Sequence, residues 1–238
     1  MRSFIENLSV TVIIPVLNEE ATIEGLLTFL CERHDRRLNK IIIVDGGSTD
    51  QTIEISKRFD VLVLQSEKKN RASQMNLGAR QIASGFLYFL HADTMPPVSY
   101  LDDLEKTVKN GSLAGSFRLQ FIGGPWLLRL NAFFTRFQGM AFRGGDQSLF
   151  IEVMLFQRLK GYDEHFNIME EYDLIRRILI ITNFNVIPKS VSVSTRKYTD
   201  NNYLKVSLAN YRAIRMFSRG ENPIEIANFY KNYLSKIR

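Results

Sequence analysis

The sequence predicts an α/β fold, a mostly parallel central sheet covered by helices on both faces, and three observations support it. Short apolar runs alternate with segments of helical periodicity over residues 1–95. The loops between these segments are short, and this alternation is typical of parallel strands joined by helices. The chain has 238 residues, 45% hydrophobic and 24% charged, which fits a soluble globular protein with an ample core.

The first half of the chain is predicted to contain four buried strands, because it holds four short runs rich in β-branched or aromatic residues. These strands are expected at 8–16, 40–44, 61–65 and 86–90. Pro15 is expected to end the first strand. Helices are expected at 21–34, 48–59 and 70–84. Ser48 and Gln51 match a capping box at the start of the second helix.

The second half is less regular. Helices are predicted at 97–109, 153–160 and 170–181, and strands at 113–121, 143–151 and 186–193. From residue 201 the pattern is mostly helical, with interruptions near Gly220 and Pro223. We expect one domain over residues 1–195 and a helical extension over residues 196–238, packed on the same domain.

The net charge of +6 is concentrated in that extension. It holds nine Lys and Arg residues against three acids, a surplus of six, so residues 1–195 balance at zero. A basic extension suits a nucleic acid, a phosphate-rich substrate, an anionic membrane or only a solvated helical face. The single cysteine, Cys31, excludes an internal disulfide and a cysteine metal cluster. With neither a signal-peptide pattern nor an apolar run of spanning length, we expect a cytoplasmic protein.

Polar residues follow three of the predicted strands. Asn18 and Glu19 come after the first strand, Asp45 after the second and Asp93 after the fourth. The carboxyl ends of parallel strands meet at one edge of a sheet, where ligands bind. Carboxylates there can accept hydrogen bonds from a nucleobase or ribose, or hold Mg²⁺ or Mn²⁺ together with substrate phosphates. The alternative for Asp93 is a surface turn in which it only caps the segment that follows.

The residues after Asp45 favour a negatively charged ligand but match neither a dinucleotide-binding motif nor a P-loop. Gly46 and Gly47 lead into a helix N-terminus, which favours negative charge. The dinucleotide fingerprint Gly-Xaa-Gly-Xaa-Xaa-Gly and the Walker lysine motif are both absent from the sequence.

Seven motifs together resemble one known family. The chain reads Val-Ile-Ile-Pro-Val-Leu-Asn-Glu-Glu at 12–20, Ile-Val-Asp-Gly-Gly-Ser-Thr-Asp at 43–50, Arg-Ala-Ser-Gln-Met-Asn-Leu-Gly-Ala at 71–79, Leu-His-Ala-Asp at 90–93, Gly-Gly-Asp-Gln at 144–147, Gly-Tyr-Asp-Glu at 161–164 and Glu-Glu-Tyr-Asp-Leu at 170–174. In order and spacing they resemble the family-2 glycosyltransferases with the GT-A fold, in particular a bacterial inverting subgroup. The resemblance implies a Rossmann-like GT-A domain, with a nucleotide-binding half at 1–95 and an acceptor half at 96–195.

The resemblance also implies roles on the donor side. The residues matched to the binding of the nucleotide-sugar are Pro15, Asn18, Glu19, Asp45, Gly46, Arg71, Gln74, Asp93 and Asp146. Among these, Asp45 matches the acid that contacts the nucleobase. Arg71 matches a phosphate contact, and Gln74 matches a residue that supports the phosphate-binding loop. Asp93 matches the last acid of the Asp-Xaa-Asp motif, which holds Mn²⁺ or Mg²⁺ and the diphosphate.

On the catalytic side, Glu170 and Glu171 match an acidic pair whose second member is the general base in inverting members of the family. Glu171 is therefore the expected base, with Glu170 or Asp173 as alternatives. His91 replaces the first acid of Asp-Xaa-Asp, and it either ligates the metal or only packs. The Gln-Xaa-Xaa-Arg-Trp motif of processive synthases is absent, so a polymerase of the cellulose or hyaluronan type is not expected.

The function that the resemblance implies is metal-assisted, non-processive sugar transfer with inversion. UDP-sugars are the commonest donors, GDP-sugars are possible, and the acceptor is not identified. The alternatives are a non-catalytic nucleotide-sugar binding protein, which His91 leaves open, and a sugar-phosphate nucleotidyltransferase. The latter usually needs a glycine-rich basic loop after the first strand, and here that loop is acidic. Nucleic acid is not an expected partner, because the extension has no binding motif beyond its charge.

The aromatic segment 126–137 and the basic extension bear on the acceptor. Trp126, Phe133 and Phe137 belong to a set that could form one apolar helix face, with Arg129 and Arg136 nearby. Such a face could contact the inner surface of a membrane peripherally. It could equally be a lid over the sheet or a homodimer interface.

Overall fold

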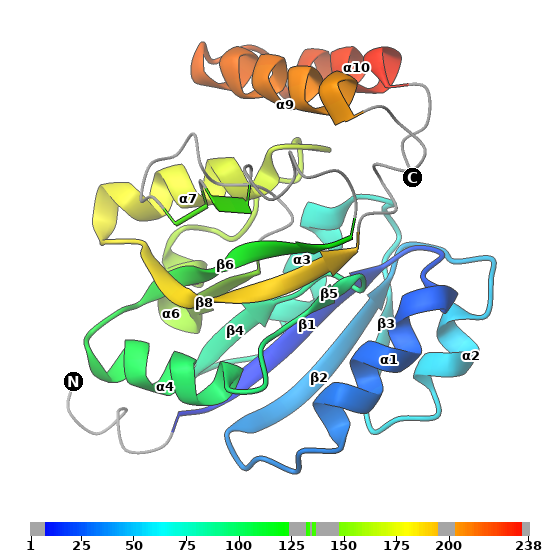
Figure 1. Cartoon of the computed structure of the whole chain (residues 1–238), viewed down its shortest axis with the longest axis vertical. Helices are drawn as coiled ribbons and strands as arrows, with labels where there is room; N and C mark the ends of the chain where they lie inside the picture. The colour runs from blue at the N-terminus through cyan, green and yellow to red at the C-terminus, as the bar shows by residue number, and fades with distance from the viewer. Residues whose placement is uncertain (1–7, 124–131, 134, 137–147, 195–202, 235–238) are drawn as a thin grey trace.

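The α/β fold is confirmed. The computed structural model describes residues 8–123, 132–133, 135–136, 148–194 and 203–234. Its described strands form one mixed sheet in the order β3-β2-β1-β4-β7-β6-β8-β5 (Figure 1). The first four strands along the chain are β1 (Val10–Val16), β2 (Leu38–Asp45), β3 (Leu62–Gln65) and β4 (Phe86–Phe89). They pair in parallel with one another, so their carboxyl ends share one edge.

The second half of the sheet is mixed. Its strands are β5 (Thr94–Met95), β6 (Ala114–Ile122), β7 (Leu149–Glu152) and β8 (Asn185–Ser194). Strand β7 runs antiparallel to both β4 and β6, and β5 antiparallel to β8, while β8 is parallel to β6. Strand β5 was not among the predicted strands, because two residues are too short to show a period.

Helices cover both faces, as predicted. They are α1 (Glu20–Cys31), α2 (Thr52–Ser56), α3 (Arg71–Ala79), α4 (Tyr100–Lys109), α6 (Val153–Arg158), α7 (Glu170–Ile181), α9 (Tyr203–Ser218) and α10 (Pro223–Tyr233). Strand β1 shows how the faces divide. Val10, Val12 and Ile14 pack in one buried cluster with α1 and α4, whereas Ile13 packs in another with α3, α6 and α7. This alternation follows from the two-residue period of a strand.

Two local predictions are wrong. Pro15 does not end β1 but lies inside it, opposite Val44 of β2. Ile13 O accepts the Leu90 N–H, so position 15, two residues on, also faces β4. The pairing of β1 with β4 stops at Ile13 and Phe89, so the N–H that proline lacks falls beyond this ladder.

The second wrong prediction is the capping box. The Ser48 hydroxyl is bonded to Asp45 at 2.7 Å, and the helix begins only at Thr52, with Gln51 at the N-cap and no side-chain cap. Helices α2 and α3 are both shorter than the predicted 48–59 and 70–84.

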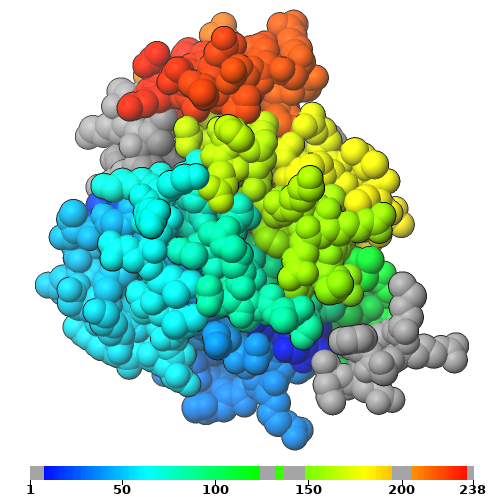
Figure 2. Space-filling view, turned by 180° about the vertical axis from the view of Figure 1, so that it is seen from behind, coloured from blue at the N-terminus to red at the C-terminus, as the bar shows by residue number. Residues whose placement is uncertain are grey.

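The basic extension forms a helical hairpin, α9 and α10, with a core of its own. Val206, Ala213, Phe217 and Ile226 are buried there against Phe166 and Tyr172, which flank the start of α7. In the space-filling view the orange and red hairpin lies directly on the yellow-green part of the chain, which includes Phe166 and Tyr172 (Figure 2). Within the ranges described above, no helix combines the length and the apolar character that crossing a membrane requires.

Candidate active site

Hydrogen bonds around Asp45 join the loops that follow β1 and β2. Asp45 is only 5% exposed, and its Oδ1 accepts the Ser48 hydroxyl at 2.7 Å and the Ser48 N–H at 2.9 Å. The Ser48 hydroxyl oxygen accepts the Asn18 N–H at 3.0 Å, and Asn18 Oδ1 accepts the Thr49 N–H at 2.8 Å. Asn18 has a left-handed φ of 56°, which asparagine tolerates better than most residues. The structure therefore brings Asn18 and Asp45 together through Ser48.

Glu19 and Glu20 are fixed against the start of α2. The Glu19 N–H donates to the Thr52 hydroxyl oxygen at 2.8 Å. The Glu20 N–H donates to Asp50 Oδ2 at 3.1 Å, and Glu20 Oε2 accepts the Gln51 N–H at 3.0 Å. These reciprocal bonds make the two loops one preformed wall beside Asp45.

Gln74 of α3 holds the ends of β1 and β2 together from behind this wall. It is 4% exposed, and its Nε2 donates to Val44 O at 2.7 Å and to Val16 O at 2.9 Å. A Cβ added at Gly46 would lie 3.1 Å from this nitrogen, closer than side chains normally pack. Gly46 and Gln74 thus fit together because position 46 has no side chain.

Arg71 is the first residue of α3. Asn70 is the N-cap of the helix, and its side chain accepts the Ser73 N–H. Arg71 Nη1 lies 3.8 Å from Glu170 Oε1, and the arginine side chain is 43% exposed. It therefore combines a contact to a buried acid with access from solvent.

Glu170 and Glu171 occupy the first turn of α7, directly after Met169, which has a left-handed φ of 68°. Their exposed fractions are 2% and 5%. Among the described residues, Oε1 of each is buried without a hydrogen-bond partner. Burial, and then the neighbouring charge of Glu171, raise the pKa of Glu170 to about 7. The two predicted catalytic carboxyls are thus adjacent, buried and under-satisfied.

His91 faces this pair from the end of β4. Its Nε2 lies 3.4 Å from Glu171 Oε1, and its side chain is 16% exposed. Burial disfavours the protonated ring, but the carboxylates of Glu171 and Asp93 outweigh burial and the repulsion of Arg71, so the pKa of His91 is raised. His91 was predicted either to ligate the metal or only to pack, and the structure places its ring within ion-pair distance of the expected general base.

Asp173, the alternative base, is occupied elsewhere. Its Oδ1 accepts from Arg176 Nη2 at 2.9 Å and its Oδ2 from Arg177 Nε at 2.8 Å. Arg177 in turn donates to the backbone oxygens of Leu159 and Gly161. Asp173 therefore anchors α7 to the segment before it. Asp146 and most of the aromatic segment 126–137, including Trp126, lie outside the described residues.

The motifs did not assign roles to several residues that build the site. Ser48 was predicted only as part of a capping box, Asn70 only as the first residue of a helix, and Glu164 only as part of the Gly-Tyr-Asp-Glu motif. Each has at least one partner distant in the sequence: Asn70 donates to the Glu164 carbonyl, 94 positions away, and Ser48 accepts from Asn18, 30 positions away. Such pairings carry no local signal, and only the fold reveals them.

A divalent cation fits the oxygen and nitrogen donors at the end of β4 in chemical type. Asp93 offers a carboxylate, and its backbone oxygen accepts the Ser194 N–H from the end of β8, which fixes its position. The described residues contain no cluster of three or more acidic, histidine or cysteine ligands. Mg²⁺ and similar ions often bind through one or two carboxylates and otherwise through substrate phosphates, which is the arrangement that Asp93 allows.

The sheet, with acids at the ends of its parallel strands, has the GT-A fold of solved glycosyltransferases. The mannosyltransferase PcManGT from Pyrobaculum calidifontis, in complex with GDP-Man and Mn²⁺, aligns with a TM-score of 0.68 at 17% identity, over 96% of this chain and 68% of that one. TarS of S. aureus (residues 1–349), in complex with UDP-GlcNAc, aligns with 0.62 at 15% identity, over 95% of this chain and 72% of that one.

The sequence assigns the family. The model of the family described as "Glycosyl transferase family 2" matches residues 11–166, and the chain belongs to that family. The succinoglycan biosynthesis protein ExoA of Rhizobium meliloti is 27% identical over 189 residues, which cover 70% of this chain. Those residues span 57% of ExoA, so this chain corresponds to little more than half of that relative.

Proposed function

We propose that this protein transfers a sugar from a nucleoside-diphosphate donor, first of all a UDP-sugar, to an acceptor hydroxyl with inversion, one residue at a time. The observation that carries the proposal is the pair of buried carboxyls, Glu170 and Glu171, set between Arg71 and His91. They stand at the same edge of the sheet as Asp45 and Asp93. In this proposal these residues serve as the general base, as cations that bind phosphate and as the acid that binds the nucleobase.

The donor side is assigned to the loops after β1 and β2. Asp45 accepts a hydrogen bond from the nucleobase of the donor, and Asn18 and Glu19 shape the wall beside Asp45. A UDP- or GDP-linked donor is supported by family membership and by the UDP-GlcNAc and GDP-Man in the two solved structures of the same fold.

Asp93 would hold the divalent cation, with His91 as a second candidate ligand, and the cation would neutralise charge that develops on the leaving diphosphate. Arg71 adds a cation at the mouth of the site, where its guanidinium can bond two phosphate oxygens. The Mn²⁺ of PcManGT supports this assignment.

Glu171 acts as the general base. Its carboxylate takes the proton of the acceptor hydroxyl while that oxygen forms a bond to the anomeric carbon from the face opposite the diphosphate. The bond from this carbon to the diphosphate oxygen breaks, and the nucleoside diphosphate leaves with the electron pair. One displacement inverts the configuration, and no covalent enzyme intermediate forms.

A thermal-shift panel of UDP, GDP, CDP and dTDP, each with and without Mn²⁺, tests the donor site. A ligand that binds only the folded protein raises the melting temperature by mass action. We expect one nucleotide to raise it, more so with Mn²⁺, and Asp93→Ala to remove the Mn²⁺-dependent part. No shift with any nucleotide would contradict the proposal.

The products released then distinguish a glycosyltransferase from a nucleotidyltransferase and from a non-catalytic binding protein. A transferase releases nucleoside diphosphate from a sugar donor. A nucleotidyltransferase releases pyrophosphate from a nucleoside triphosphate, and a binding protein shows a thermal shift without either product.

The exposed face of α9 is assigned to peripheral contact with an anionic membrane. Leu208 and Tyr211 are 43% and 60% exposed, and Arg212, Arg215 and Arg219 lie on the same helical face and its continuation. No acid occurs within α9, so this face attracts anionic lipid. Flotation with vesicles of phosphatidylcholine and phosphatidylglycerol tests it: recovery with neutral vesicles alone, or with neither, would contradict the contact.

A further inference from the structure

A polar network ties the loop before α7 to helix α3. This 161–169 loop runs from Gly161 to Met169 and delivers Glu170 and Glu171 to the site. We propose that Asn70 and Glu164 are positioning residues, which hold this loop on α3 and so fix the two carboxyls against Arg71 and His91. The inference rests on the proposed function only for its effect on turnover.

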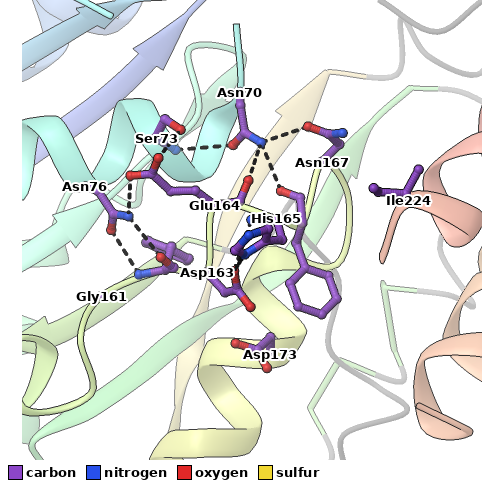
Figure 3. A network of polar contacts seen from close by, with 12 residues as sticks. Asn70, Ser73, Asn76, Gly161, Asp163, Glu164, His165, Asn167, Asp173 and Ile224 are labelled. Carbon is purple, nitrogen blue, oxygen red and sulfur yellow. Dashed lines mark hydrogen bonds and ion pairs between the residues drawn. The ribbon is translucent and has the colours of Figure 1, made fainter. Parts of the chain in front are cut away.

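Asn70 makes the first tie (Figure 3). Its Nδ2 donates to the Asn167 side chain at 2.8 Å, to Glu164 O at 3.1 Å and to Phe166 O at 3.3 Å. Its Oδ1 accepts the Ser73 N–H at 3.2 Å, which caps α3. One side chain therefore caps the helix that carries Arg71 and also holds the loop that carries the carboxyls.

Glu164 makes the second tie. Its Oε2 accepts from the Ser73 hydroxyl and from Lys68 Nζ, both at 2.9 Å, and its Oε1 accepts from Asn76 Nδ2 at 3.2 Å. The ammonium of Lys68 and these hydrogen bonds hold the pKa of Glu164 at about 2. Glu164 is thus an ionised anchor set into the side of α3.

Asn76 fixes the beginning of the loop. Its Nδ2 donates to Tyr162 O and its Oδ1 accepts the Tyr162 N–H, both at 2.9 Å. Gly161 has a φ of +69°, and a Cβ there would lie 2.6 Å from Asn76 Oδ1. The backbone approaches α3 so closely that only glycine fits at position 161.

The loop needs such ties because its end is unfavourable in isolation. Two adjacent carboxyls are buried there, and charge repulsion and desolvation both favour their movement toward water. Met169, just before them, has a left-handed φ of 68°, which costs on the order of 1–2 kcal/mol for a residue of this kind. On its other side the loop packs on the hairpin, with the Phe166 and Phe217 rings 5.8 Å apart. The start of α7 is therefore clamped between α3 and α9.

Asn70→Asp separates positioning from helix capping. Aspartate caps a helix as well as asparagine does, so the bond from Ser73 survives, but the Nδ2 donor is lost and a negative charge faces backbone oxygens. Glu164→Gln keeps the size and removes the charge. Asp163→Asn is the matched control, because it removes a charge one residue away whose side chain bonds His165 instead.

The first readout is steady-state release of nucleoside diphosphate from UDP-GlcNAc, UDP-glucose and GDP-mannose by the full chain. We expect Asn70→Asp and Glu164→Gln to lower kcat on the order of 10- to 100-fold. The UDP affinity of both variants should stay within about threefold of wild type, because UDP binding does not depend on the hydrogen bonds that hold the 161–169 loop on α3. Asp163→Asn should match wild type, because it leaves those hydrogen bonds intact. A kcat within twofold of wild type for both variants would overturn the inference, as would a loss confined to KM.

The second readout is hydrogen exchange of the backbone amides, which does not depend on turnover. We expect Asn70→Asp to speed exchange in residues 161–175 while β1 and β2 keep wild-type rates. Unchanged exchange in 161–175, or an equal increase throughout the chain, would overturn the tie itself. If wild type shows neither a thermal shift with any nucleotide nor nucleotide release, the proposed function fails, and exchange alone still decides whether Asn70 holds the loop.

Discussion

Two sets of buried acids line the same edge of the sheet, and they are held in opposite ways. Asp45 lies in a loop wall where Ser48 supplies both a hydroxyl and an N–H to its carboxylate. Glu170 and Glu171 lie equally deep, yet Oε1 of each has no hydrogen bond among the described residues and only a longer ion-pair contact, 3.8 Å to Arg71 and 3.4 Å to His91 respectively. The carboxylate of Asp45 is stabilised by its own hydrogen bonds, whereas Glu170 and Glu171 are kept buried by the packing of the start of α7.

This difference indicates how the work is divided. A satisfied acid on a preformed wall binds a nucleotide with little reorganisation. Buried carboxyls with unfilled oxygens destabilise the fold locally, and such groups concentrate at catalytic sites. The comparison predicts that substitutions at Glu170 and Glu171 change turnover and pH dependence, whereas a substitution at Asp45 changes the affinity for the nucleotide.

Glu171→Gln should have the largest effect. The amide keeps the shape but cannot take a proton, so we expect kcat to fall on the order of 10²- to 10⁴-fold. UDP affinity, measured by calorimetry, should stay within about threefold. Turnover equal to that of wild type would remove Glu171 from the role of base.

Asp45→Asn should have the next largest effect, now on affinity. The amide oxygen can still accept hydrogen bonds from Ser48, so the wall should persist. The variant loses the negative charge that strengthens a hydrogen bond from the nucleobase. We expect UDP to bind about 10- to 100-fold more weakly, equivalent to about 1.4–2.8 kcal/mol, with kcat at saturating donor changed far less. Unchanged UDP affinity together with a large loss of kcat would reverse the division between the two sets.

Glu170→Gln should change the pH dependence of stability. The folded state raises the pKa of Glu170 from 4.5 to about 7, so the folded protein binds this proton more tightly than the unfolded chain does. The stability from protonated Glu170 is complete below pH 4.5 and is lost as pH rises to about 7. The variant should therefore gain up to about 3 kcal/mol over wild type at pH 8 and little at pH 4.5. Parallel urea-unfolding profiles across this range would contradict the prediction.

The sequence predicted the parts of the fold that local patterns encode. Continuous apolar runs located β1 to β4, and the predicted helix at 170–181 coincides with α7. The strand ends then placed Asn18, Asp45 and Asp93 at one edge, because parallel strands align their carboxyl ends.

The rest depends on contacts that no local pattern encodes. The closeness of His91 to Glu171, 3.4 Å from ring nitrogen to carboxylate oxygen, depends on how the end of β4 packs against the start of α7. Pro15 was predicted to end its strand because proline has no N–H to donate. It fits inside β1 because the pairing with β4 stops at Ile13 and Phe89, which only tertiary structure decides. Glu170 and Asp173 were equivalent candidates by sequence, and only their partners separate them.

Asp173→Asn should have the smallest effect on turnover and so sharpens the choice of base. Both oxygens of Asp173 accept hydrogen bonds from arginines, Arg176 and Arg177, so this carboxylate is held against α7's own cations and not presented to an acceptor hydroxyl. We expect kcat to stay within about threefold of wild type, while the lost ion pairs lower stability by about 1–3 kcal/mol, measured by urea unfolding. Arg176→Met, which removes only the more exposed of the two partners, is the control and should cost less. A loss of kcat as deep as that of Glu171→Gln, at a temperature where the variant is folded, would make Asp173 the base and would mean that α7 turns its arginine-bound face to the acceptor.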